Sequence, residues 1–256
     1  MATWSDDLAL AHELADAADD ITRARYEAAD LVVETKPDLT PVTEADREVE
    51  HELRAMLGAE RRRDAILGEE QGASGSGRRR WIIDPIDGTR NYSRGVPVWA
   101  TLIALEEDGR IVLGVVSAPA LHRRWWAERG GGAHAGGDVV HVSAVRRPED
   151  AVLSFALEQS IPALAGRAWH ARGYGDFWSH MLVAEGSVDG AIDAIGVSVW
   201  DLAAVQVIVE EAGGTFTDFA GAGRIDGGSA ISSNGHLHPA LLDAVAALAR
   251  TEQAET

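Results

Sequence analysis

Residues Trp81–Thr89 read W-I-I-D-P-I-D-G-T, an apolar segment that runs directly into two acids, a glycine and a threonine. The apolar part predicts a buried strand, and Pro85 stops its ladder hydrogen bonding because proline has no backbone N–H. The strand end therefore presents the carboxylates of Asp84 and Asp87 close together. Hard oxygen donors crowded in this way favour a hard divalent cation such as Mg²⁺. Gly88 lets the backbone approach a ligand, so its N–H and the next one are candidates for holding a phosphate.

A second short strand also ends in acids. Asp64–Gly68 is predicted as a short strand that ends in Glu69-Glu70, and the glycine- and serine-rich residues 72–77 then form a flexible loop. The ends of two strands in one sheet can lie side by side, so Glu69 is placed to share an ion with the aspartates of the next strand. The alternative is a solvated turn without a ligand.

Two helices precede these strands. Ser5 or Asp6 caps the first, whose apolar residues recur at steps of three and four. Residues 33–41 are polar and contain two prolines, so we expect a loop there. Thr43 opens the second helix, with Asp46 at its third position. This spacing is a variant capping box and by itself favours a structural role for Asp46.

The strands that follow are adjacent in sequence and favour antiparallel pairing. Val98–Glu107 and Ile111–Pro119 flank Asp108-Gly109, a strong hairpin signal. Residues 125–127 form a further strand, which Gly130–Gly132 ends in a turn. We therefore expect residues 1–145 to form an N-terminal half with helices and a mostly antiparallel sheet.

The remaining residues, 146–256, alternate strands and helices and predict a second, mixed α/β half beyond the polar segment Ala144–Asp150. The expected elements are strands at Ala151–Ala156, Gly190–Asp193, Thr215–Phe219 and Ser229–Ser232, and helices at Asp176–Glu185, Trp200–Ala212 and about Pro239–Arg250, the last capped by Asn234. Asp201 lies in the first turn of its helix, where the helix dipole alone favours an acid. Its side chain is also free to face a cation between the two halves.

Composition excludes several classes of protein. Cysteine is absent, which excludes disulfides, thiolate catalysis and zinc–thiolate sites. The net charge of −18 argues against nucleic acids and anionic membranes as partners, and no apolar run approaches the ~20 residues of a membrane span. The acidic N-terminus does not look like a signal peptide, so we expect a cytoplasmic protein. The nine histidines lack zinc-ligand spacing and are interpreted as structural, with His180 nearest the site in sequence.

Three motifs in order resemble the inositol-monophosphatase-like family of Mg²⁺-dependent phosphomonoesterases. They are Gly68-Glu69-Glu70, the D-P-I-D-G-T run at Asp84–Thr89, and Trp200–Ala204 followed by Glu211–Gly214. Their order and spacing resemble the family over nearly the whole chain, and Val33–Glu50 and Arg94–Ala100 resemble its histidinol-phosphate phosphatase branch. The resemblance implies an α/β fold, an αβαβα layered sandwich with the site between its two sheets.

The resemblance also implies a role for each matched residue. The implied metal ligands, for two or three Mg²⁺ ions, are Glu69, Asp84, the backbone carbonyl of Ile86, Asp87 and Asp201. The amides of Gly88 and Thr89 would hold the phosphate. Asp46 and Thr89 would orient or activate the attacking water, which overrules the purely structural interpretation of Asp46. Glu69 is also counted as catalytic, and Asp201 also as substrate-binding.

The leaving group is assigned from fewer residues. In the inositol-cleaving branch a glutamate lies seven positions before the helix aspartate, where this chain has Ala194, so inositol phosphate fits poorly. Asp176 and Asp193 are acids where a leaving group would sit, and carboxylates suit the ammonium and imidazole of histidinol. They are equally compatible with a helix cap and a solvated strand end. Arg90, just after the phosphate loop, is a further candidate for substrate contact.

The sequence thus predicts a Mg²⁺-dependent phosphomonoesterase that hydrolyses L-histidinol phosphate, a step of histidine biosynthesis, by attack of an activated water. Two alternatives stay open. One is an inositol-1-phosphate or broad sugar-phosphate phosphatase, and the other is a non-catalytic regulator that binds metal or phosphate on the same scaffold. The expected partner is a small phosphate monoester, with no nucleic acid and no membrane, and the family resemblance suggests a homodimer.

Overall fold

The computed structural model describes residues 4–37, 39–155, 165–193 and 197–255. Its helices are α1 (Ser5–Arg25), α2 (Glu44–Glu60), α3 (Thr89–Tyr92), α5 (Asp176–Ala184), α6 (Val199–Glu211) and α7 (His238–Glu255), with short 3-10 turns at Pro119–Leu121 and Pro148–Asp150. Its strands are β1 (Val33–Thr35), β2 (Pro41–Thr43), β3 (Ala65–Gly68), β4 (Gly72–Ser74), β5 (Arg79–Asp87), β6 (Ala100–Glu107), β7 (Arg110–Ala118), β8 (Arg123–Glu128), β9 (Gly132–Ala135), β10 (Asp138–Val140), β11 (Val152–Phe155), β12 (His170–Arg172), β13 (Gly190–Asp193), β14 (Thr215–Thr217) and β15 (Ala230–Ser233).

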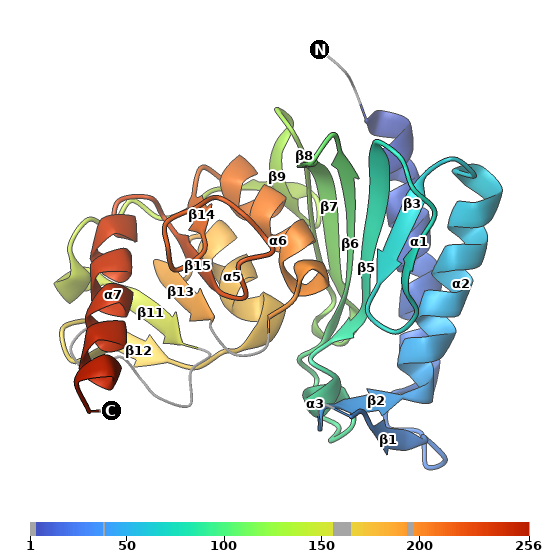
Figure 1. Ribbon diagram of the computed structural model, residues 1–256, viewed down its shortest axis with the longest axis horizontal. Helices are drawn as coiled ribbons and strands as arrows, with labels where there is room; N and C mark the ends of the chain where they lie inside the picture. The colour runs from blue at the N-terminus through green and yellow to red at the C-terminus, as the bar shows by residue number, and fades with distance from the viewer. Residues whose placement is uncertain (1–3, 38, 156–164, 194–196, 256) are drawn as a thin grey trace.

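These elements stack in five alternating layers (Figure 1). Helices α1 and α2 cover the outer face of an eight-stranded sheet, α5 and α6 lie between it and a five-stranded sheet, and α7 covers the far face of the smaller sheet. The predicted αβαβα sandwich is therefore confirmed. None of the described helices combines the length and hydropathy of a membrane span.

The larger sheet has the order β10-β9-β8-β7-β6-β5-β3-β4 and is antiparallel except for the pair β3–β5. The predicted hairpin joins β6 to β7, and both turn residues have positive φ, 52° at Asp108 and 78° at Gly109. This is the backbone conformation in which an Asp-Gly pair matches the twist of a hairpin. The parallel pair places the end of β3 beside β5, so the amide of Glu69 donates to the carbonyl of Ile83 at 3.3 Å.

Three predictions about the path of the N-terminal half were wrong. The expected loop 33–41 contains β1 and the first residue of β2, which pair antiparallel, and the expected loop 72–77 begins with β4, which pairs with β3. Strand β5 does not stop at Pro85 but continues to Asp87 after a register shift. In each case a neighbouring strand supplies pairing partners that local composition does not reveal. Strands β9, β10 and β12 and helix α3 were also not predicted.

The smaller sheet has the order β12-β11-β13-β15-β14, with parallel pairs at the β12 edge and antiparallel pairs at the β14 edge. Its predicted strands and helices agree with the structure to within two residues at each described end, except that the last helix runs further, to Glu255. Residue 156, predicted as the end of a strand, lies outside the described residues. Asn234 does not cap α7. Its Oδ1 accepts from the amide of Leu237, in the turn before the helix.

Helix α6 is the centre of the molecule. Most of its residues are buried, and its apolar side chains share one cluster with Ile82, Leu102 and Val116 of the larger sheet. A helix that is apolar on all sides is expected only where protein surrounds it. The predicted halves 1–145 and 146–256 are thus joined through a common core, and the division at 145 stays a prediction.

The contact between α6 and β7 has no room for a side chain at Gly114. A Cβ there would lie 2.8 Å from the Cα of Ala204 and 2.9 Å from its carbonyl oxygen. We expect Gly114→Ala to lower the free energy of unfolding by about 1–3 kcal/mol in denaturant titrations, because helix and strand must separate.

A matched control is Gly58→Ala in α2, where a Cβ would have no neighbour within 4 Å. That change should raise the free energy of unfolding by about 0.5–1 kcal/mol, since alanine is the better helix former. Equal stability of the two variants would contradict the close approach of α6 to β7.

Candidate active site

Three carboxylates meet between the two sheets. Asp84 and Asp87 come from the bulged end of β5, and Asp201 comes from the first turn of α6. One oxygen of each lies within 4.8 Å of the others. The bulge makes this possible, because between Asp84 and Asp87 the register against β6 shifts and both side chains face the same space. Buried Asp84 leaves its Oδ1 without a hydrogen-bond partner among the described residues.

The electrostatics of this triad, Asp84, Asp87 and Asp201, are unfavourable without a cation. Burial, followed by repulsion from neighbouring acids, raises the pKa of Asp84 and of Asp87 well above the usual range. Burial likewise raises the pKa of Asp201 to about 7, although its hydrogen bond from Ser198 acts in the opposite direction. Oxygen donors that are buried, close together and incompletely hydrogen-bonded are the ligand set of a hard divalent cation. The triad therefore fits a metal site.

Two members of the triad also accept hydrogen bonds from the N-terminal ends of helices. The Oδ2 atom of Asp87 accepts from the amide of Phe177 at 2.7 Å, which satisfies an N–H at the start of α5. The Oδ2 atom of Asp201 accepts from the amide of Ser198 at 2.5 Å at the start of α6. The first turn of a helix carries partial positive charge, so both helices stabilise the carboxylates that they hold.

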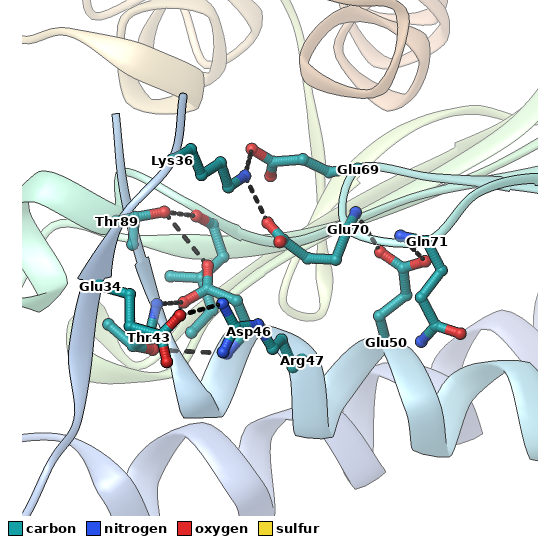
Figure 2. Close-up of polar contacts among 11 residues, drawn as sticks. Glu34, Lys36, Thr43, Asp46, Arg47, Glu50, Glu69, Glu70, Gln71 and Thr89 are labelled. Atoms are coloured by element: carbon teal, nitrogen blue, oxygen red, sulfur yellow. Dashed lines mark hydrogen bonds and ion pairs between the residues drawn. The ribbon is translucent and has the colours of Figure 1, made fainter. Parts of the chain in front are cut away.

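Asp46 and Thr89 form a hydrogen-bonded pair beside the triad (Figure 2). The Oδ2 atom of Asp46 accepts from the amide and hydroxyl of Thr43, as the capping box predicts, while its Oδ1 lies 3.2 Å from the Thr89 hydroxyl. That hydroxyl is also 2.8 Å from the carbonyl oxygen of Ile86. Burial raises the pKa of Asp46 to about 6, although its hydrogen bonds from Thr43 act in the opposite direction. The cap and the contact to Thr89 use different oxygens, so both interpretations of Asp46 hold.

Glu69 forms an ion pair with Lys36, a residue that was not predicted to belong to the site. The ammonium of Lys36, from the segment between β1 and β2, is 2.8 Å from Glu69 Oε1 and 2.5 Å from Glu70 Oε1 (Figure 2). Burial lowers the pKa of Lys36, but the two ion pairs outweigh this and raise it overall. Buried Glu50 of α2 accepts from the amides of Glu70 and Gln71 and so fixes the turn that carries Glu69.

The triad borders a cavity of about 640 Å³ between the sheets. Its lining residues are Thr40, Pro41, Glu69, Asp84, Ile86, Asp87, Gly88, Thr89, Arg90, Asn91, Asp176, Phe177, His180, Asp193, Val197, Ser198, Trp200, Asp201 and Leu202. Gly88 has φ of 85°, and a Cβ there would lie 3.0 Å from the carbonyl oxygen of Val98. Glycine is therefore required for the turn from β5 into α3.

Comparison with known proteins agrees with this geometry. The model of the inositol monophosphatase family matches residues 4–253. The chain belongs to this family. It is thus a member of a family of phosphoric monoester hydrolases, and the resemblance of its three motifs is confirmed.

Two relatives in this family are histidinol-phosphatases. The chain is 52% identical over 252 residues to that of Mycobacterium tuberculosis, covering 93% of this chain and 96% of the relative. It is 51% identical over 260 residues to that of Streptomyces coelicolor, covering 94% and 97%. Among solved structures, an IMPase of Thermotoga maritima has a TM-score of 0.87 at 32% identity, covering 96% of this chain and 99% of that chain.

The predicted leaving-group acids both reach the cavity. Asp176 is the first residue of α5, with φ of 46°, and the N-cap position is occupied by Gly175, so the cap interpretation of Asp176 is wrong. Asp193 ends β13 and is 8% exposed, so it is not a solvated strand end. Ala194 lies outside the described residues. Arg90 is exposed at the cavity edge.

Two polar groups at this site, Lys36 and Asn91, were not predicted from the sequence. Lys36 lies in a segment predicted as a loop, and the amide of Asn91 is 2.9 Å from the carbonyl of Val98 and 3.5 Å from Asp176. Their contacts span up to 85 positions of sequence. The one available signal was the proximity of Asn91 to the D-G-T motif.

We expect Asp87→Asn to lower phosphatase kcat by about 10²-fold or more with the fold intact, because the amide can still accept from Phe177 but removes a charge from the triad. Phosphate release and circular dichroism measure the two effects. Asp226→Asn, at an exposed aspartate paired with Arg224, is the matched control and should keep full activity. Retained activity of Asp87→Asn would contradict the assignment of the triad.

The raised pKa values of the triad predict a pH-dependent effect of metal on stability. Because the folded pKa lies above the unfolded one, the metal-free protein loses stability as pH rises from about 4 through the folded pKa, which is about 7 for Asp201. A cation removes this penalty. The rise in Tm on replacing chelator by excess MgCl₂ should therefore be larger at pH 8 than at pH 6. An equal rise at both values would contradict the prediction.

Proposed function

We propose that this chain is a Mg²⁺-dependent phosphomonoesterase that hydrolyses L-histidinol phosphate to L-histidinol and phosphate. The observation that carries the proposal is the triad, which lines one cavity with Gly88 and Thr89, while Thr89 contacts the buried carboxylate of Asp46. The two histidinol-phosphatases support the choice of substrate, because they match nearly the whole chain at about half identity.

The proposed ligands of two or three Mg²⁺ ions are Glu69, Asp84, the carbonyl of Ile86, Asp87 and Asp201. When bound, the cations would neutralise charge on the phosphoryl group and on the leaving oxygen, which is the main requirement of phosphoryl transfer. The amides of Gly88 and Thr89 would hold the phosphoryl oxygens. These groups lie on the rigid end of β5 and the start of α3, so they are ordered before substrate arrives.

The pair Asp46–Thr89 supplies a route for the proton of the attacking water. The Thr89 hydroxyl has one proton and two acceptors in reach, the Ile86 carbonyl at 2.8 Å and Asp46 at 3.2 Å. When that proton points to Asp46, a lone pair of the hydroxyl is free to accept from water. A carboxylate with a pKa of about 6 is ionised at pH 7 and can take the proton, as general base catalysis requires. Thr43 holds the other oxygen of Asp46 and so fixes its orientation.

Charge favours a cationic leaving group. Asp176 and Asp193 line the cavity, and the carboxylates of this region repel one another in the absence of cations. The ammonium and imidazole of histidinol complement such a surface, whereas a neutral polyol leaves it uncompensated. Arg90 is placed at the cavity edge to meet the phosphate.

Two alternatives are separated by one experiment. Phosphate release from histidinol phosphate, inositol 1-phosphate and sugar phosphates, with and without Mg²⁺, tests the proposal on the purified protein. We expect Mg²⁺-dependent release with the highest kcat/KM for histidinol phosphate. Comparable values for inositol 1-phosphate would favour a broad phosphatase, and no release from any ester would favour a non-catalytic regulator. A cytoplasmic location and a homodimer stay proposals, which cell fractionation and light scattering test.

We expect Asp46→Asn to lower kcat by about 10²-fold while the Mg²⁺ concentration for half-maximal activity stays near the wild-type value. The amide keeps one acceptor for the cap but is not a base. Asp243→Asn, an exposed change in α7, is the control and should leave both quantities unchanged. A loss of Mg²⁺ affinity as large as the loss of rate would instead make Asp46 a metal ligand.

A further inference from the structure

One buried histidine at the cavity has a nitrogen that the fold leaves unsatisfied. His180 lies on α5 and is 1% exposed. Its Nδ1 shares a 2.7 Å hydrogen bond with the hydroxyl of Ser232 on β15, whereas its Nε2 has no hydrogen-bond partner among the described residues. A histidine that serves packing alone is expected to have both nitrogens satisfied, because a buried orphan costs about 1–3 kcal/mol.

The unsatisfied nitrogen lies beside an acid of the same cavity. Nε2 is 3.9 Å from Asp193 Oδ2, which is too long for a direct hydrogen bond. His180, Asp193 and Asp176 all line the space that borders the triad. A donor nitrogen about 2.9 Å from each of two acceptors at this separation can bond to both. The two acceptors subtend about 85° at such a nitrogen, so each hydrogen bond bends by about 12° from a tetrahedral N–H direction, which stays within ordinary hydrogen-bond geometry.

The subsite also lies on the same side of the cavity as the triad. His180 follows Phe177 by about one turn of α5, the amide of Phe177 bonds to Asp87, and Asp193 lines the same cavity. In a 2-amino phosphate ester the ammonium is on the carbon next to the one that bears the ester oxygen. A phosphate held at Gly88 and Thr89 therefore keeps its ammonium on the same side of the cavity as the triad.

We propose that His180 and Asp193 together bind the ammonium group of the leaving alcohol, so that the enzyme selects phosphate esters of 2-amino alcohols over those of neutral alcohols. This inference rests on the proposed function. In it the Nδ1–H of His180 donates to Ser232, so Nε2 is the acceptor that faces the ammonium and Asp193 carries the compensating charge. His180 is thus a specificity residue that contacts substrate, and Ser232 positions it.

Two variants separate the two nitrogens of His180. The amide of asparagine approximates Nδ1, so His180→Asn keeps the contact with Ser232 and removes the atom that faces Asp193. The amide of glutamine approximates Nε2, so His180→Gln does the reverse. The substrates are histidinol phosphate and its desamino analogue, 3-(imidazol-4-yl)propyl phosphate, compared by the ratio of their kcat/KM values with saturating Mg²⁺.

We expect His180→Asn to lower this ratio about tenfold, mainly through KM for histidinol phosphate, and His180→Gln to restore part of it. His141→Asn, at an exposed histidine, is the control and should keep the wild-type ratio. An unchanged ratio in His180→Asn, or equal losses on both substrates, would overturn the proposal, since a merely structural histidine affects both esters alike.

Asp193→Asn keeps the side-chain volume and tests the subsite if the His180 variants do not fold. It should lower the ratio at least as much, because it removes the charge that the ammonium needs, and a wild-type ratio would overturn the proposal. Failure of the proposed function can be distinguished from failure of the proposed subsite. A wild-type enzyme that releases no phosphate from histidinol phosphate contradicts the proposed function, whereas an active wild type with unaltered variants contradicts the subsite alone.

Discussion

The mutual repulsion of three crowded carboxylates is the constraint on which the site depends. Asp84, Asp87 and Asp201 would separate, or take up protons, unless something held them within 4.8 Å. The protein holds them by a bulge in β5 and by the first turns of α5 and α6, whose amides bond to two of them. The helices thus provide part of the positive potential, and a divalent cation would provide the rest.

Several residues serve the fold and the site at once. Asp46 caps α2 with one oxygen and contacts Thr89 with the other, and Asp201 caps α6 while it faces the triad. Asp87, at the end of β5 in the larger sheet, accepts from an amide in the first turn of α5, which packs against the smaller sheet. A structural and a functional interpretation of such an acid are therefore not alternatives, because a carboxylate has two oxygens and each has more than one lone pair.

Helix α6 connects this chemistry to the stability of the core. It is buried between the two sheets, packs closely against β7 at Gly114, and carries Asp201 in its first turn. The well-packed interior resists small shifts, so the carboxylate is placed by the packing of the whole helix rather than by its own rotamer alone. His180 on α5 likewise faces Asp193. The 3.9 Å between its Nε2 and Asp193 Oδ2 is too long for a direct hydrogen bond, and Nε2 has no other partner among the described residues.

Patterns along the sequence predict the features that local spacing encodes. These are the Asp108-Gly109 hairpin, the capping box at Thr43, the acid in the first turn of α6, and the acids at the ends of β3 and β5, all of which depend on neighbours a few residues away. The motif order also gave the family and the expected ligands, although not their geometry.

Which of those groups meet depends on the fold. Lys36 pairs with Glu69 and Glu70, and the amide of Phe177 bonds to Asp87, so these contacts join segments that lie far apart in the sequence. The position of the unsatisfied His180 nitrogen beside Asp193 depends on contacts of the same kind. The strand pairings of β1, β4 and β12 belong to the same class. Their stability comes from partners that the fold brings near, and a composition pattern carries no record of partners at a distance.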